Sequence, residues 1–184
     1  TLLLQVNNPN AQLFAAPNNS ICIGQSVVVA APSGYTNYTL SLGDGSMVIS
    51  PNFSVSHSYT AAGTYPASVT IIDANGCKSS STLNFYVQSY PIADFIVTSP
   101  GAQFPNVACL GDVTFSSTST SNPTYNLTYN WNAANGASLL PIPVVIVSYT
   151  NTGTFPVSMT VSTPFGCKST LIKVVNIFGA KANL

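Results

Sequence analysis

Two short stretches of the chain alternate apolar and polar residues with a period of two. One reads Tyr-Pro-Ala-Ser-Val-Thr-Ile at residues 65–71, and the other reads Phe-Pro-Val-Ser-Met-Thr-Val at residues 155–161. This alternation buries one face of a β-strand and exposes the other. Further short runs rich in Val, Ile, Thr, Tyr and Phe are punctuated by 13 prolines and 12 glycines, and signals for helices are nearly absent. The pattern predicts an all-β sandwich.

The two alternating stretches belong to a longer internal repeat, which fixes the organisation of the chain. The matched segments are Ser58–Tyr65 with Ser148–Phe155, Gly76–Ser79 with Gly166–Ser169, and Cys22–Gly24 with Cys109–Gly111. We therefore expect two copies of one module in tandem, at residues 9–89 and 90–178.

The two ends of the chain resemble the junction between the modules. Leu2–Val6 resembles the closing strand of the first module at Leu83–Val87, and Ala182–Leu184 resembles the opening strand of a module. Residues 1–8 are thus expected to be the closing strand of a preceding module or a linker, and residues 179–184 the start of a following module or a tail. The hypothesis is a slice through a longer array. The rival is a filament subunit polymerised by donor-strand exchange.

The four cysteines allow three pairings. Each module contains one cysteine near its start and one in the hairpin after its alternating strand. Because a repeat is expected to repeat its own bridge, we predict the disulfides Cys22–Cys77 and Cys109–Cys167. Zinc is disfavoured, since the cysteines lack Cys-x-x-Cys spacing and His57 is the only histidine. Disulfides indicate an extracellular or cell-surface location.

Charge is almost missing from the chain. Four Lys+Arg and four Asp+Glu give 4% charged residues and zero net charge, where a soluble domain carries about 25%. This balance excludes the basic surface that nucleic-acid binding needs, and also a polybasic membrane contact. The apolar stretch Leu139–Val147 contains two prolines and is far shorter than the roughly 20 residues of a membrane-spanning helix.

Several motifs resemble the polycystic kidney disease (PKD) domain family. They are Tyr-Thr-Leu-Ser-Leu-Gly-Asp-Gly at residues 38–45, His-Ser-Tyr at residues 57–59 and Gly-Thr-Tyr at residues 63–65. The resemblance implies an immunoglobulin-like β-sandwich in each half of the chain, to which the repeat argument adds one disulfide each. Leu40 replaces the family's Trp in the first module. The second module keeps Trp131 but departs from Gly-Asp-Gly. The cysteines and the richness in Asn, Ser and Thr resemble the PKD-type repeats of giant surface adhesins of gliding bacteria.

Asp44 lies between Gly43 and Gly45 and has two interpretations. A calcium site needs about six or more oxygen ligands, usually from several carboxylates. The other three acidic residues are scattered, and Asn135 replaces Asp44 in the second module. We therefore predict a turn in which the glycines adopt positive φ and the Asp side chain bonds its own backbone. No metal or cofactor is expected.

The aromatic residues are predicted to form the core. Trp131 could stack on a sugar, but its place on the third strand of a sandwich, beside the predicted Cys109–Cys167 bridge, favours burial. Tyr59 and Tyr149 match between the modules, whereas Tyr65 is replaced by Phe155. A hydroxyl is thus dispensable at the second pair, and the first pair is a candidate for a corner hydrogen bond.

An enzyme is disfavoured, because the chain has no Glu, no Arg and a single His. The leading hypothesis is a set of non-enzymatic structural or adhesive modules in a cell-surface stalk, adhesin or filament. Its expected partners are neighbouring copies of the module, with surface polysaccharide or glycan as a further candidate. The alternative is a carbohydrate-binding accessory module of a secreted hydrolase. The outward residues of the two alternating strands provide no row of aromatic side chains for that role.

Overall fold

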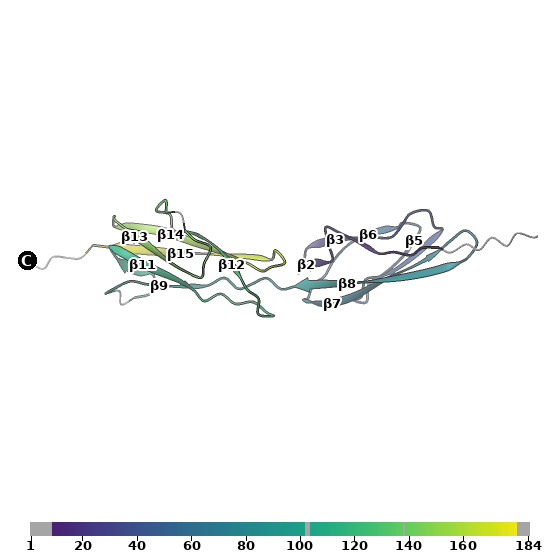
Figure 1. Ribbon diagram of the computed structural model, residues 1–184, viewed down its shortest axis with the longest axis horizontal. Coiled ribbons are helices and arrows are strands. Elements are labelled where there is room, and N and C mark those ends of the chain that lie inside the picture. Colours follow the sequence, from purple (N-terminus) through teal and green to yellow (C-terminus); the bar gives the residue numbers. More distant parts are fainter. Residues whose placement is uncertain (1–8, 102–103, 138, 180–184) are drawn as a thin grey trace, which may run out of the picture. The chain divides into compact units, whose positions relative to one another are not determined.

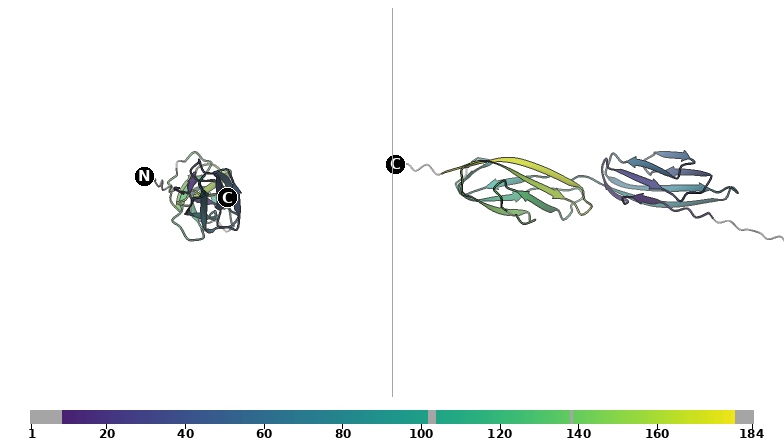
Figure 2. Two further views of the ribbon diagram at one scale, coloured as in Figure 1. Left: turned by 90° about the vertical axis from the view of Figure 1, so that its right-hand side faces the viewer. Right: turned by 90° about the horizontal axis from the view of Figure 1, so that it is seen from above.

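The computed structural model describes residues 9–101, 104–137 and 139–179 (Figures 1 and 2). Every helix or strand in these residues is a β-strand, which confirms the predicted all-β class. The chain divides into two compact units, residues 1–89 and 90–184, called module 1 and module 2. The strands expected at Leu2–Val6 and Ala182–Leu184 lie outside the described residues.

Module 1 is built from two β-sheets. Its strands are β1 (Phe14–Ala16), β2 (Ser20–Cys22), β3 (Ser26–Ala30), β4 (Asn37–Ser41), β5 (Met47–Ser50), β6 (Ser54–Ser58), β7 (Gly63–Ile72) and β8 (Lys78–Gln88). One sheet has the order β1-β3-β6 and the other has the order β2-β8-β7-β4-β5. β2 pairs with β8 in parallel, whereas β7 pairs with β8 in an antiparallel hairpin.

Module 2 is also built from two β-sheets, with four strands in the larger one. Its strands are β9 (Phe95–Thr98), β10 (Val107–Cys109), β11 (Gly111–Ser117), β12 (Thr128–Asn132), β13 (Val144–Tyr149), β14 (Gly153–Ser162) and β15 (Lys168–Phe178). The sheets have the orders β13-β11-β9 and β10-β15-β14-β12. The parallel pair is again the short second strand with the last strand, β10 with β15.

The two alternating stretches form the inner faces of the hairpin strands, as predicted. In β7, the side chains of Ala67, Val69 and Ile71 are fully buried, and the residues between them are partly exposed. In β14, Val157 and Met159 are buried in the same way. Burial of each larger aliphatic side chain contributes about 1.5–3 kcal/mol. Each module has its own hydrophobic core.

The prediction of one disulfide inside each module is wrong. Cys77 and Cys109 are free thiols. The two disulfide-bonded cysteines are Cys22 and Cys167. The predicted pairs Cys22–Cys77 and Cys109–Cys167 are therefore both absent, although all four residues lie in the described part of the chain.

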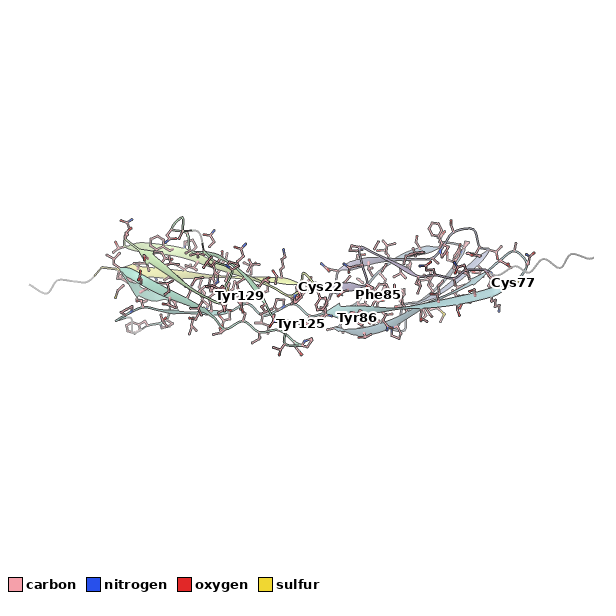
Figure 3. All side chains as sticks on the ribbon, in the orientation of Figure 1. Cys22, Cys77, Phe85, Tyr86, Tyr125 and Tyr129 are labelled. Carbon is pink, nitrogen blue, oxygen red and sulfur yellow. The ribbon has the colours of Figure 1, made fainter. Side chains whose placement is uncertain are left out.

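In module 1 the reason is the register of β2 against β8. Cys22 is in register with Gln88, the last residue of β8. Cys77 directly precedes Lys78, the first residue of this 11-residue strand. At about 3.3 Å per residue, the strand separates the two cysteines by roughly 35 Å, whereas a disulfide needs Cα atoms about 4.4–6.8 Å apart. Figure 3 shows Cys22 and Cys77 at opposite ends of module 1.

The same geometry separates the cysteines of module 2. Cys109 is in register with Phe178, the last residue of β15. Cys167 directly precedes Lys168, the first residue of that 11-residue strand. A bridge between Cys109 and Cys167 would also have to span the whole strand, so the repeat places its two cysteines at opposite ends of the sandwich.

Candidate functional site

The Gly43-Asp44-Gly45 segment forms a tight turn between β4 and β5. The backbone N–H of Leu42 donates to the carbonyl oxygen of Ser46 at 2.9 Å. Asp44 Oδ1 accepts a hydrogen bond from the backbone N–H of Ser46 at 3.0 Å. Gly43 and Gly45 have φ angles of 85° and 95°, in the left-handed region that favours glycine. The carboxylate therefore bonds the backbone of its own turn.

The second oxygen of Asp44 contacts His57 of β6. The distance from Asp44 Oδ2 to His57 Nε2 is 2.7 Å. Burial raises the pKa of Asp44, but the N–H of Ser46 and the His57 side chain outweigh it and hold the pKa below its ordinary value. Both carboxylate oxygens of Asp44 thus have protein partners. Few of their lone pairs remain free to bind a cation. Within the described residues, no group of three or more His, Cys, Asp or Glu side chains could hold a metal ion.

Module 2 builds the same turn from different residues. Ala134, with φ 56°, stands where Gly43 stands in module 1, and Asn135 replaces Asp44. Asn135 Oδ1 accepts a hydrogen bond from the backbone N–H of Ala137 at 3.1 Å, and its Nδ2 donates to the carbonyl oxygen of Ser148 at 3.4 Å. Because an uncharged amide makes the same backbone bond, the turn has a structural role that needs no carboxylate.

A hydrogen bond from a buried tyrosine joins each of these turns to the opposite sheet. Tyr59 Oη donates to the carbonyl oxygen of Leu42 at 2.9 Å, and Tyr149 Oη donates to that of Ala133 at 3.1 Å. Both tyrosines are at most 2% exposed. Burial raises the pKa of each to about 12, with the charge of Asp44 as a further cause at Tyr59. The corner hydrogen bond expected of this matched pair is present in both modules.

The other matched aromatic pair packs beside these tyrosines. The rings of Tyr59 and Tyr65 are stacked with centroids 4.4 Å apart, and those of Tyr149 and Phe155 lie 4.7 Å apart. Tyr65 Oη donates to the carbonyl oxygen of Ala61 at 2.9 Å. Phe155 has no hydroxyl to repeat that bond, so only the ring contact is common to the modules.

Trp131 lies in the core of module 2 and is only 6% exposed. Its ring contacts Phe95 and Phe115 at centroid distances of 5.2 Å and 6.2 Å. Its Nε1–H donates to the carbonyl oxygen of Ile142 at 2.9 Å. Trp131 is thus not exposed to stack on a sugar. The Cys109–Cys167 bridge expected beside it does not form.

The outward face of the long hairpin in module 1 is mainly small and uncharged. On β7, Thr64 and Pro66 are exposed, and Ser68 and Thr70 are partly buried. The neighbouring strand adds one aromatic ring, Tyr86, which is 44% exposed and in register with Thr64 (Figure 3). A single ring among hydroxyl-bearing side chains differs from the row of aromatics expected of a sugar-binding face.

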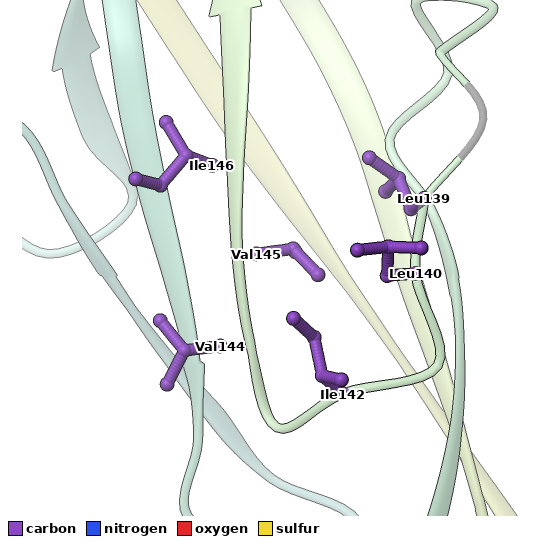
Figure 4. A pocket seen from close by; sticks show the side chains of 6 residues that line it. All are labelled: Leu139, Leu140, Ile142, Val144, Val145 and Ile146. Carbon is purple, nitrogen blue, oxygen red and sulfur yellow. The ribbon is translucent and has the colours of Figure 1, made fainter.

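An apolar groove lies along β13 of module 2 (Figure 4). Its volume is about 360 Å³, and its lining residues are Leu139, Leu140, Ile142, Val144, Val145 and Ile146. Leu140 and Ile146 are 66% and 64% exposed. β13 is also at the edge of its sheet, and exposed apolar edge strands are the type of surface that binds other chains. The signal in the sequence is the apolar run Leu139–Val147, which is too short for a membrane span but long enough for an exposed apolar strand with its preceding loop.

Two packed sheets with a long hairpin define each module as an immunoglobulin-like β-sandwich. The PKD domain family matches residues 6–88 and, separately, residues 101–176. The chain belongs to the PKD domain family, with two members in tandem. No curated protein matches the chain. The described residues contain no helix that is long and apolar enough to cross a membrane.

Two solved structures show the same fold at low sequence identity. The fibronectin(III)-like modules of CbhA from Clostridium thermocellum have a TM-score of 0.50 and 14% identity, over 94% of this chain and 97% of theirs. The C-terminal 282-residue fragment of intimin, in complex with the intimin-binding domain of the translocated intimin receptor, has a TM-score of 0.56 and 13% identity. That match covers 92% of this chain and 64% of the fragment. These similarities concern the fold alone.

Proposed function

We propose that the chain is a non-enzymatic structural and adhesive segment of an extracellular cell-surface stalk, adhesin or filament. The observation that carries this proposal is the tandem repetition of one PKD sandwich, with the same turn, the same tyrosine hydrogen bond and the same cysteine places in both copies. Repetition of a module lengthens a projection, whereas a catalytic role would require a site that differs from the scaffold.

The surface chemistry supports association with neighbouring copies of the module. The chain is only 4% charged, with zero net charge, and a neutral surface promotes association between chains. The apolar groove along β13 adds exposed Leu140 and Ile146 in module 2. Copies of such modules would pack against one another without strong electrostatic repulsion.

Immunogold labelling of intact source cells tests this location. Antibodies against the chain should label projections outside the envelope of unpermeabilised cells. Label that appears only after permeabilisation, or only on secreted material, would overturn the proposal. A denaturing gel after full reduction then separates two architectures. A polypeptide far larger than 19.1 kDa indicates a covalent array of modules, whereas a band at that mass indicates a separate filament subunit.

The carbohydrate-binding alternative has less support. Its best sequence candidate, Trp131, is buried and bonded to Ile142, and β7 with β8 presents the single ring of Tyr86. A pull-down with insoluble polysaccharides measures this role directly. Retention of the purified chain by one polysaccharide, abolished by Tyr86→Ala, would favour the accessory-module function instead.

A further inference from the structure

Each module contains two distinct places for a cysteine. One place is the end at which the last strand finishes, here called the exit end, and Cys22 and Cys109 occupy it. Their backbone positions are equivalent, because the residue after each cysteine donates its backbone N–H to the carbonyl oxygen of the last residue of the closing strand. These bonds join Ile23 to Gln88 at 2.9 Å and Leu110 to Phe178 at 3.0 Å.

The other place is the hairpin before the last strand, here called the hairpin end, and Cys77 and Cys167 occupy it. The carbonyl oxygen of Cys77 accepts from the N–H of Asp73 at 3.0 Å, and that of Cys167 accepts from the N–H of Thr163 at 2.9 Å. The same turn therefore holds both cysteines. Each module thus has one cysteine at its exit end and one at its hairpin end.

The two bonded cysteines and the two free cysteines each comprise one residue from an exit end and one from a hairpin end. The disulfide-bonded residues, Cys22 and Cys167, are one exit-end and one hairpin-end cysteine. They are 1% and 0% exposed. The free thiols, Cys109 and Cys77, are again one of each kind; Cys109 is exposed and Cys77 is partly exposed.

We propose that Cys109 of one copy of the chain forms a disulfide with Cys77 of the following copy. The proposal deepens the proposed function, on which it rests, by naming a second copy as the partner and the two thiols as the linking site. A bridge within one module is excluded for either thiol by the 11-residue strand that separates the two ends. The link joins unlike ends, so it is heterologous and propagates head to tail.

The chemistry is oxidation by a disulfide oxidant such as oxidised glutathione. The thiolate of Cys109 attacks the oxidant and forms a mixed disulfide, releasing one glutathione thiolate. The thiolate of Cys77 from the second copy then attacks the Cys109 sulfur of that mixed disulfide and releases the second glutathione. The two protein thiols lose two electrons and two protons, and one oxidised glutathione becomes two reduced molecules.

Oxidation of the purified chain tests the link. The chain, with Cys22 and Cys167 still bonded, is incubated in a glutathione redox buffer, its remaining thiols are blocked, and it is run on a non-reducing gel. The wild-type chain should give a ladder of multiples of 19.1 kDa, which collapses on reduction. C77S and C109S should each stop at the dimer, because each retains one free thiol.

Mixing the two variants, with a size tag on one, tests the head-to-tail pairing. The Cys109–Cys77 heterodimer should exceed each homodimer by about tenfold, whereas pairing without preference gives about twofold. As a matched control, C109S/N130C moves the exit-end thiol to exposed Asn130 on β12, and its mixture with C109S should show no such excess. Peptide mapping identifies each bond.

Three results would overturn the proposal: no disulfide-linked dimer, homodimers as abundant as the heterodimer, or a Cys77–Cys109 bond within the monomer. None of them would affect the cell-surface labelling, because modules can also be joined by the polypeptide itself or by non-covalent packing. Conversely, the purified chain could form the disulfide-linked ladder while the protein is absent from the cell surface. That result would support the disulfide link and overturn the proposed function.

Discussion

At the scale of single residues, one hydroxyl group in each module joins the turn after the fourth strand to the facing sheet. Tyr149→Phe removes the bond to the Ala133 carbonyl and should lower the free energy of unfolding by about 1–2 kcal/mol, because a buried acceptor is left unpaired. Tyr59→Phe should act alike in module 1. Tyr65→Phe is the matched control, since Phe155 already stands at its equivalent position, and should cost less. Urea denaturation measures the free energy of unfolding of all three variants. Equal losses of stability would contradict the role assigned to the hydroxyl groups of Tyr59 and Tyr149.

The same two tyrosines predict a loss of stability at alkaline pH. Their folded-state pKa is raised to about 12, above the ordinary value of about 10. The folded state therefore holds protons that the unfolded state has released, so stability is full below pH 10 and falls as the pH rises toward 12. The free energy of unfolding, measured by denaturation, should be lower at pH 11.5 than at pH 9 by about 1–2 kcal/mol per tyrosine. If a Tyr59→Phe/Tyr149→Phe variant kept the full difference between the two pH values, these two tyrosines would not be its cause.

Substitution of Trp131 tests whether this residue stabilises the core or binds a sugar. Trp131→Ala should lower the free energy of unfolding of module 2 by about 3–5 kcal/mol, because it leaves a cavity beside Phe95 and Phe115. Exposed Tyr86→Ala serves as the control, with an expected change near zero. Chemical denaturation followed by circular dichroism measures both. Unchanged stability combined with lost polysaccharide retention would instead make Trp131 a binding residue.

At the scale of elements, the turn between β4 and β5 approaches the backbone of β7. A Cβ atom added to Gly43 would lie 2.9 Å from the backbone nitrogen of Pro66, whereas one added to Gly45 meets nothing within 4 Å. Both glycines have positive φ. Gly45→Ala should therefore cost about 1 kcal/mol from backbone strain alone, and Gly43→Ala about 2–4 kcal/mol, because overpacking is added. Thermal unfolding compares the two; the reverse order would refute the close approach.

The sequence predicts those features that depend on local pattern. Period-two alternation identifies the inner faces of β7 and β14, and comparison of the two halves identifies the modules and their matched tyrosines. The disulfides could not be predicted in this way. Their geometry depends on β2 pairing in parallel with β8, a contact between residues more than sixty positions apart. A repeat also does not reveal whether its bridge closes within one copy.

Other parts of the candidate sites were missed for similar reasons. The sequence identifies His57 only as the single histidine and as part of the His-Ser-Tyr motif, whereas in the structure it contacts Asp44 across 13 positions of sequence. The groove along β13 was missed because its apolar run, with two prolines, resembles neither a half-buried strand nor a membrane span. Both features arise only when a loop and a strand come together.

At the scale of the whole molecule, the two modules share a scaffold and differ in their exposed chemistry. Module 1 carries the Asp44–His57 pair, and module 2 carries the exposed apolar groove. The scaffold is common, and the groove is the exposed apolar surface to which the proposed function assigns contact with other chains. This division of roles is the one expected of an adhesive stalk, in which repeated sandwiches provide length and a few surfaces provide contact.

The most direct measurement of the central claim is the attachment of source cells after in-frame deletion of residues 9–178. The account predicts that the deletion strain grows normally, but attaches less to surfaces and carries shorter or missing projections. A strain in which these residues are replaced by two unrelated immunoglobulin-like modules separates length from contact, because it should restore the projections but not the attachment. Unchanged attachment and projections, together with lost polysaccharide binding or hydrolysis, would contradict the account.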